Sequence, residues 1–302
     1  MSNWLRSLSN YNKMIKLSHT LFALPFAGLA TVLALVESKE EPNVLWQKVF
    51  WIGICMVSAR SAAMGFNRYI DRDIDARNPR TALREIPAGK VSETNAIVFI
   101  VLSCLIFLAA SWMIHFLCFV LAFPALFLVL FYSYSKRFTF LCHFILGASI
   151  GIAPLGAWIA ILGSFSLIPI LWSLGLLFHI AGFDILYSTQ DSDFDRSQGL
   201  HSVPARFGIP FALLLAKVLH AISFAFLLYA GYTAHLGAYY YIFLAITGIL
   251  FIAEHALVSP KDLSKVPIAF FHINASISGV LFLGILIEKL PQLIEKFSGK
   301  SP

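Results

Sequence analysis

The sequence predicts an all-α polytopic membrane protein with about nine transmembrane helices, and three observations carry that prediction. The mean hydropathy of the 302 residues is +0.79. Hydrophobic residues make up 59% of the chain and charged residues only 13%, about half the charged fraction of a typical soluble domain. Nine apolar stretches are each long enough to cross a bilayer as a helix. A water-soluble globular protein is therefore excluded, and we expect one integral-membrane domain over residues 1–302.

The apolar stretches give the expected spans in chain order. The first follows Lys13 and Lys16 as the core of a signal peptide would, but further spans follow it and no small-residue cleavage site is evident. We therefore interpret it as a membrane helix. The nine expected spans cover residues 18–36, 47–66, 95–114, 117–134, 142–162, 166–186, 211–230, 236–253 and 267–287.

The distribution of basic residues predicts that the N-terminus is cytoplasmic. In that orientation most of the 22 Lys and Arg residues fall in the N-terminal tail and in the loops after the second, fourth, sixth and eighth spans. Cytoplasmic segments of membrane proteins carry such an excess. Topology therefore explains the net charge of +6, and we do not expect nucleic acid as a partner.

Aspartates gather in two windows on the predicted cytoplasmic side. Seven of the eight lie in residues 67–89 and 184–208, which overlap the two long polar loops expected near 67–94 and 187–210. Each window contains the pattern D-x-D-x-D and begins at the end of an even-numbered span. This repetition is consistent with an internal duplication of the chain.

The spacing of the acids predicts a metal site. If the second and sixth spans continue helically beyond the membrane, residues four apart share one helix face. Like charges on such a face repel each other and require a cation. The absence of nearby Cys or paired His favours a hard ion with oxygen ligands, most simply Mg²⁺. Asp73 and Asp193 are expected to point elsewhere. The expected faces carry Asn67, Asp71 and Asp75 in the first window and Tyr187, Asp191 and Asp195 in the second.

Basic residues near both windows predict an anionic ligand. Arg and Lys bind phosphate, and phosphate oxygens readily share the coordination shell of Mg²⁺. For either window alone, a solvated loop with surface ion pairs is an equally good interpretation. Two windows of matching spacing on one side of the membrane favour a site for a metal and a polyanion. The basic residues concerned are Arg72, Arg80, Arg84, Lys136, Arg137 and Arg196.

Arg60 is a cation inside the second span. A charge at this depth is costly and marks functional sites, and Arg60 lies seven residues before Asn67 near the same helix face. It is suited to a substrate carboxylate, with pairing to the helix that carries Asp184 as the alternative. Tyr132, four residues before Lys136, either faces the site or anchors the helix at the interface. Other polar residues are expected to form interhelical hydrogen bonds, among them His179, His220, Glu254, His272 and Asn274.

Both windows resemble the motifs of the UbiA superfamily of membrane prenyltransferases. The first motif of that family is N-x-x-x-D-x-x-x-D and the second is D-x-x-x-D. The matching residues are Asn67, Asp71 and Asp75, then Asp191 and Asp195, with the R-T-x-x-R-x-I-P-x-G sequence that starts at Arg80, the Y-x-x-x-K-R sequence that starts at Tyr132, and Arg60.

The resemblance implies a helical bundle around a central cavity in which Mg²⁺ binds a polyprenyl diphosphate. Metal and basic groups would stabilise the departing diphosphate, and an aromatic ring would attack the cationic allylic carbon. The metal ligands implied are Asn67, Asp71, Asp75, Asp191 and Asp195. The diphosphate ligands expected are Arg80, Lys136 and Arg72. The residues expected near the acceptor are Arg60, Tyr187 and Tyr132, and the catalytic acids are Asp71, Asp191 and Asp184.

Quinone biosynthesis is the natural pathway for such an enzyme, with the small aromatic acid 4-hydroxybenzoate as the expected acceptor. Dihydroxynaphthoate in menaquinone synthesis is the alternative acceptor. Haem O synthase-like farnesyl transfer fits less well because the second acidic motif is complete. A cation transporter is disfavoured because the acids concentrate at one membrane surface rather than at the midplane. We expect a bacterial inner membrane as the location, with the active site facing the cytoplasm, membrane lipid around the protein and no stable protein partner.

Overall fold

The computed structural model describes residues 11, 13–15 and 24–298. Within these residues, eight helices are long and apolar enough to cross a membrane, and they coincide with the second to ninth expected spans. The all-α prediction is therefore confirmed. The long helices are α3 (Pro42–Ile70), α5 (Glu93–Ile114), α6 (Phe116–Ser135), α7 (Cys142–Gly151) followed by α8 (Ala153–Leu162), α9 (Leu167–Ser188), α12 (Ile209–Thr233), α13 (Ala238–Leu257) and α15 (Asn274–Ser298).

The first expected span, 18–36, lies partly outside the described residues. Its described part is α2 (Leu24–Glu37), a helix of 14 residues that packs on α8 and α15. Fourteen helical residues extend about 21 Å, which is shorter than the roughly 30 Å hydrocarbon core of a bilayer.

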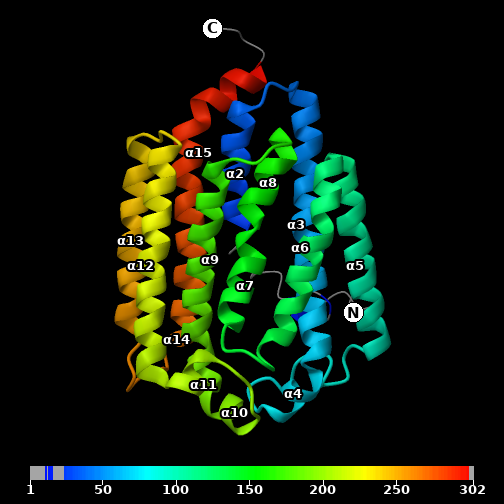
Figure 1. Ribbon diagram of the computed structural model, residues 1–302, viewed down its shortest axis with the longest axis vertical. Coiled ribbons are helices and arrows are strands. Elements are labelled where there is room, and N and C mark those ends of the chain that lie inside the picture. Colours follow the sequence, from blue (N-terminus) through cyan, green and yellow to red (C-terminus); the bar gives the residue numbers. More distant parts are fainter. Residues whose placement is uncertain (1–10, 12, 16–23, 299–302) are drawn as a thin grey trace, which may run out of the picture.

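The long helices form a bundle in which neighbours in sequence are mostly neighbours in space (Figure 1). Helix α3 packs on α5, α5 on α6, and α6 on α7. Helix α9 packs on α7 and α12, and α13 packs on α15. Helix α15 contacts α2, which contacts α8 in turn. The last long helix thus packs against the first described helix, α2. The helices form a closed ring around an interior space.

The fifth span is two helices rather than one. Helix α7 ends at Gly151, and Pro154 stands in the first turn of α8, where its missing N–H costs no hydrogen bond. Gly147 and Gly151 face α9 at very short range: a Cβ on Gly147 would lie 2.5 Å from the carbonyl oxygen of Leu177. Two glycines four residues apart therefore let the α7 backbone approach α9 closely, as small residues do in membrane bundles.

Substitution of Gly147 tests this close approach. Gly147→Ala must displace α9, and overpacking of this kind costs about 1–3 kcal/mol. We expect a lower thermal unfolding midpoint in detergent than for the wild type. Gly53→Ala in α3 is the matched control because, apart from the adjoining backbone of α3, no heavy atom of the described residues lies within 4 Å of its Cβ position. Equal midpoints for the two variants would contradict the close packing of α7 on α9.

Short helices cap one end of the bundle and hold both aspartate windows (Figure 1). They are α4 (Arg72–Arg77) in the first window, and the 3₁₀ turn η2 (Thr189–Asp191) with α10 (Ser192–Ser197) and α11 (Val203–Phe207) in the second. A further short helix, α14 (Val266–Ile268), and a π-helical turn, Ala269–Ile273, precede α15.

The windows lie at the same end, as predicted, but neither is a straight continuation of its span. The helix breaks at Asp71, and a six-residue helix begins at the next residue. The second window repeats this arrangement, with Asp191 directly before the six-residue helix α10. Asp71 and Asp191 therefore stand directly before the two short helices, and Asp75 and Asp195 lie within them.

Candidate active site

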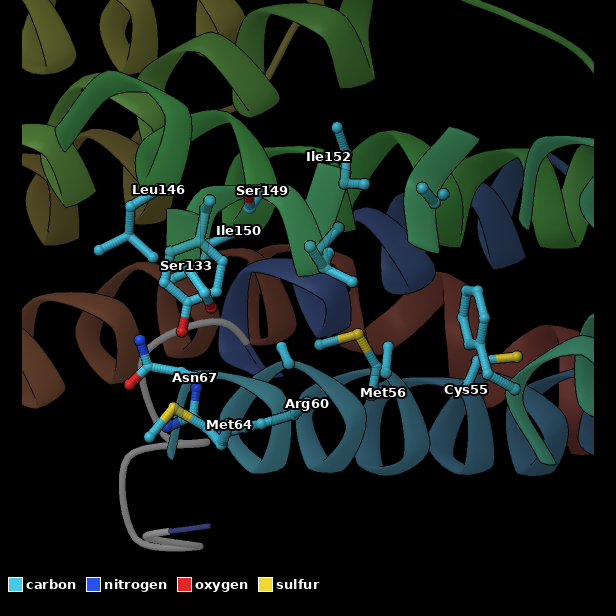
Figure 2. A pocket seen from close by; sticks show the side chains of 18 of the residues that line it. Cys55, Met56, Arg60, Met64, Asn67, Ser133, Leu146, Ser149, Ile150 and Ile152 are labelled. Atoms are coloured by element: carbon cyan, nitrogen blue, oxygen red, sulfur yellow. The ribbon is translucent and has the colours of Figure 1, made fainter. Parts of the chain in front are cut away.

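A cavity of about 460 Å³ lies between α3, α5, α6, α7, α8 and α9 (Figure 2). Its wall is mostly apolar along the membrane-spanning helices, with side chains such as Ile52, Met56 and Phe107. Its polar part lies at the end of the bundle that carries the aspartate windows. The charged and polar residues there are Asn67, Arg68, Asp71, Arg84, Lys136, His143, Asp184, Tyr187, Asp195 and Ser202.

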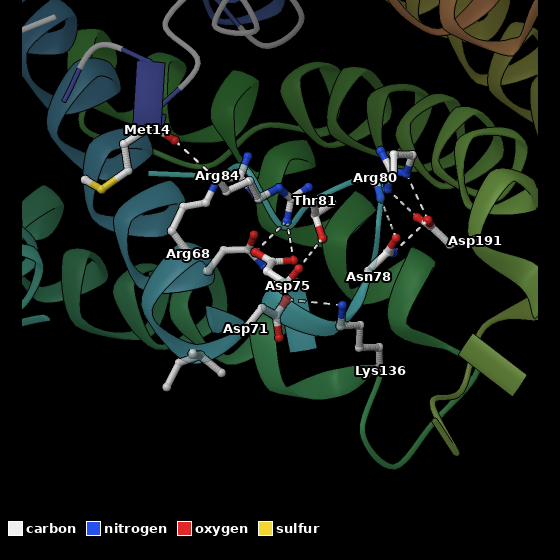
Figure 3. Close-up of polar contacts among 12 residues, drawn as sticks. Met14, Arg68, Asp71, Asp75, Asn78, Arg80, Thr81, Arg84, Lys136 and Asp191 are labelled. Carbon is white, nitrogen blue, oxygen red and sulfur yellow. Dashed lines mark hydrogen bonds and ion pairs between the residues drawn. The ribbon is translucent and has the colours of Figure 1, made fainter. Parts of the chain in front are cut away.

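Asp71 is a buried carboxylate in contact with the cavity and with two cations. Lys136 Nζ lies 3.2 Å from its Oδ2 atom, and Arg137 Nη2 lies 2.9 Å from its Oδ1 atom. The amide of Asn67 donates to Oδ2 over 3.2 Å. Figure 3 shows the Lys136 contact at the break between α3 and α4. The carboxylate predicted as a metal ligand thus lies beside the cations predicted to bind phosphate.

Asp75 is buried and held by Arg84. Both carboxylate oxygens accept hydrogen bonds from Arg84 Nη1, at 2.7 and 2.8 Å (Figure 3). The hydroxyl of Thr81 donates to the backbone oxygen of Asp75 over 3.1 Å. The R-T-x-x-R sequence therefore folds back onto α4 and fixes its position.

Asp191 joins the second window to the first. It accepts hydrogen bonds from Arg80 Nε at 2.9 Å and from Asn78 Nδ2 at 3.0 Å (Figure 3). Arg80 Nη1 also donates to the Tyr187 hydroxyl over 2.7 Å. Burial lowers the pKa of Arg80, but its bonds to Asp191 and Tyr187 outweigh that effect, and the pKa is raised above its ordinary value. Arg80 therefore keeps its charge beside Tyr187, which lines the cavity.

Sequence reasoning missed His143, which orients Asp184. His143 Nε2 accepts the backbone N–H of Val203 at 3.2 Å, so the ring proton is on Nδ1. Nδ1 donates to Asp184 Oδ2 over 2.6 Å. A single histidine at the start of a span gives no signal in the sequence, and its partner is 41 residues away.

Arg60 and Tyr132 both line the cavity. Figure 2 shows Arg60 on α3 between Met56 and Asn67. Arg60 Nε is buried and forms no hydrogen bond with any residue that the structure describes. Asp184, on the helix considered as the alternative partner of Arg60, bonds to His143. Within the described part of the chain, Arg60 Nε is therefore a donor without an acceptor in a residue of the cavity wall.

Arg72 is not brought to this site, contrary to its predicted part in diphosphate binding. Its Nε atom lies 3.2 Å from Glu93 Oε2, and its guanidinium covers the ring of Tyr69. The helix break at Asp71 turns the next residue toward the start of α5. Asp73 and Asp193 have side chains that are 78% and 97% exposed, as the spacing predicted.

The predicted metal ligands divide between residues that line the cavity and residues that do not. Asn67, Asp71 and Asp195 line the cavity. Asp75 pairs with Arg84, which lines the cavity, and Asp191 pairs with Arg80, which donates to the hydroxyl of the cavity residue Tyr187. All donors in this set are carboxylate or amide oxygens, which suit a hard divalent cation. The carboxylates of Asp71, Asp75 and Asp191 are each paired with Lys or Arg, so the negative charge is already balanced by positive charge.

Known proteins resemble this chain over most of its length. The UbiA prenyltransferase family model matches residues 23–276. The 4-hydroxybenzoate octaprenyltransferase of Serratia proteamaculans is 29% identical over 287 residues, 95% of this chain and 94% of that protein. The solved structure of a UbiA homolog from Aeropyrum pernix K1 has a TM-score of 0.80 at 29% identity, covering 89% of this chain and 97% of that one. The UbiA homolog from Archaeoglobus fulgidus bound to GPP and Mg²⁺ has the same fold, with a TM-score of 0.65 at 21% identity over 91% of this chain and 99% of that one.

Proposed function

The chain belongs to the UbiA prenyltransferase family, and we propose that it transfers a polyprenyl group from a polyprenyl diphosphate to 4-hydroxybenzoate in a reaction that depends on Mg²⁺. One observation carries the proposal: a single cavity joins an apolar wall, the side chain of Arg60, whose Nε atom has no hydrogen-bond partner among the described residues, and a polar end of buried carboxylates and cations. A prenyl chain, an aromatic acid and a diphosphate each need one of these three environments.

The polar end is suited to Mg²⁺ and diphosphate together. Asn67, Asp71, Asp75, Asp191 and Asp195 are the residues proposed to hold the metal. When bound, Mg²⁺ supplies positive charge that stabilises the departing diphosphate. Lys136 and Arg80, which pair with Asp71 and Asp191 in the described structure, are then available to bind phosphate oxygens. Arg84 replaces Arg72 in this proposal because Arg84 lines the cavity.

The apolar wall and the buried acids account for the remaining chemistry. The wall excludes water from the cationic allylic carbon, so that ring attack prevails over hydrolysis. Arg60 binds the carboxylate of the acceptor, and Tyr132 lies beside the ring. Asp184, fixed by His143, orients the acceptor hydroxyl or accepts the proton that the ring loses, with Asp191 and Tyr187 as the alternative groups.

The acceptor is proposed from the kind of relative that the chain matches. The Serratia protein is named a 4-hydroxybenzoate octaprenyltransferase, and the two proteins cover nearly all of each other's length. We place the enzyme in a bacterial inner membrane with the polar end in the cytoplasm. The excess of Lys and Arg on that side of the predicted topology supports this placement.

The test is prenyl transfer by the purified full-length chain in lipid nanodiscs. Octaprenyl diphosphate and Mg²⁺ are supplied with either 4-hydroxybenzoate or dihydroxynaphthoate, and the products are identified by mass spectrometry. We expect a prenylated hydroxybenzoate and no prenylated naphthoate. Product with dihydroxynaphthoate alone would replace the proposed acceptor. Folded protein that gives no product with either acceptor, at several prenyl chain lengths, would overturn the proposed reaction.

A further inference from the structure

A second polar cluster lies outside the cavity, where α9, α12, α13 and α15 approach one another. It consists of His220 on α12 and of Glu254 and His255 on α13. His220 and Glu254 are buried, and His255 is half-buried. None of the three is among the residues that line the cavity. The cluster is therefore separate from the proposed reaction, and its own contacts must explain it.

The hydrogen bonds of His220 place a lone pair at the centre of the cluster. His220 Nε2 lies 3.2 Å from the backbone oxygen of His179, which can only accept, so Nε2 carries the ring proton. In the neutral ring, Nδ1 is then a bare acceptor. This Nδ1 atom lies 3.0 Å from His255 Nε2 and 3.3 Å from Glu254 Oε2. Two acceptors, His220 Nδ1 and the carboxylate oxygen, therefore face each other in a buried space, and a positive charge between them would remove the repulsion.

The groups around the cluster hold these atoms in place. Asn274 Nδ2 donates to Glu254 Oε1 over 2.9 Å, which leaves Oε2 directed at His220. The same Nδ2 donates to the backbone oxygen of Ala269 over 3.0 Å, at the start of the π-helical turn before α15. π-Helical turns are rare and are frequently found at functional sites. A histidine fixed by a backbone carbonyl and a carboxylate fixed by an amide form the outer support that metal sites require.

We propose that His220 Nδ1, His255 Nε2 and Glu254 Oε2 bind one transition-metal ion, most simply Zn²⁺. One ligand atom from each of the three residues lies within 4.8 Å of the other two. Zn²⁺ bonds to His nitrogen and carboxylate oxygen at about 2.0–2.2 Å, so its ligands stand about 3.3 Å apart, close to two of the distances observed here. Two imidazoles and one carboxylate suit Zn²⁺ rather than Mg²⁺, which prefers oxygen ligands. The ion would link α12 to α13 and, through Asn274, to α15.

Cobalt(II) binding to the full-length chain in detergent tests the proposal. Tetrahedral Co²⁺ is a visible-light reporter for a zinc site. We expect one Co²⁺ per chain with visible absorption bands. Because the wild type also has the carboxylates of the cavity, the same titration is made on the double variant Asp71→Asn with Asp195→Asn. Bands that persist in this double variant come from Co²⁺ bound at the cluster. This result does not depend on whether the proposed prenyl transfer occurs.

Substitutions within the cluster decide the assignment. Glu254→Gln removes the charge of the carboxylate but keeps the shape of the side chain. His255→Gln removes one imidazole at a position that is only half-buried. Both are expected to weaken Co²⁺ binding by roughly tenfold or more and to remove the bands. His272→Gln is the matched control because this nearby histidine is exposed, and its titration is expected to match the wild type.

Thermal unfolding gives a second measurement. Zn²⁺ binds the folded state and is expected to raise the unfolding midpoint of the wild type and of His272→Gln, but not that of His255→Gln. Bands that survive in both cluster variants, or no bands in the double variant, would overturn the proposal. A protonated Glu254 that donates to His220 would then account for the cluster.

Discussion

Asp71→Asn is expected to lower prenyl transfer by about 10²- to 10³-fold, the loss typical when one charge-stabilising group is removed from a catalytic site. The Asp71 side chain is 3% exposed, contacts the cavity and lies beside two cations. Asn keeps the shape and one oxygen but removes the charge that Mg²⁺ needs. The measurement is the initial rate of 4-hydroxybenzoate prenylation at saturating Mg²⁺.

Asp73→Asn is the matched control for Asp71→Asn. It removes the same charge two residues away, from a side chain that is 78% exposed. Exposed surface charges of this kind contribute little to stability, and Asp73 does not line the cavity. The rate should therefore stay within about twofold of the wild type. Asp195→Asn and Asp193→Asn form the same comparison in the second window. A rate measured in excess EDTA gives the baseline without metal, and an equal loss for Asp71→Asn and Asp73→Asn would refute the assignment of Asp71.

Removal of Asp71 also leaves two cations without their counter-charge. Lys136 and Arg137 both pair with this carboxylate, so a folded-state effect must be separated from a catalytic one. Thermal unfolding of each variant makes that separation. If Asp71 is catalytic, the rate of Asp71→Asn must fall strongly although most of the variant remains folded at the assay temperature, as its unfolding midpoint shows.

Local patterns in the sequence predicted most of the fold. Apolar stretches of bilayer length identified eight of the long helices because a membrane span must satisfy its backbone hydrogen bonds within one segment. The four-residue spacing of the aspartates also predicted which acids are buried and which are exposed. Asp71 and Asp75 are buried and Asp73 is exposed even though the helix breaks at Asp71. The spacing survives the break because the short helix α4 follows at once.

Contacts between distant residues could not be predicted in the same way. His143 and Asp184 are joined only because α7 packs on α9, and His220 meets Glu254 only because α12 packs on α13. Arg72 was assigned to the site from its neighbours in sequence, whereas Glu93 at the start of α5 holds it elsewhere. A sequence pattern gives the face of one helix, and these three cases depend on which helix lies opposite.

Arg60→Met is expected to raise the KM for 4-hydroxybenzoate by about 10- to 100-fold, since a buried hydrogen bond to a charged group contributes about 1.5–3 kcal/mol. Arg60 lines the cavity, and its Nε atom has no hydrogen-bond partner among the described residues. A guanidinium in this state is available to pair with the carboxylate of an acceptor. Methionine keeps much of the apolar side chain and removes the charge, so kcat is expected to change much less than KM.

Comparison of acceptors separates carboxylate binding from a general loss of packing. The wild type should strongly prefer 4-hydroxybenzoate to a phenol that carries an uncharged group in place of the carboxylate. In Arg60→Met this preference should largely disappear, and Arg60→Lys should restore part of it because the charge returns. Arg77→Met, at an exposed position on α4, is the control and should keep the preference. If Arg60→Met lowered the rate with both acceptors equally, Arg60 would act on the diphosphate or on the fold of α3, and the carboxylate of the acceptor would need another partner in the cavity.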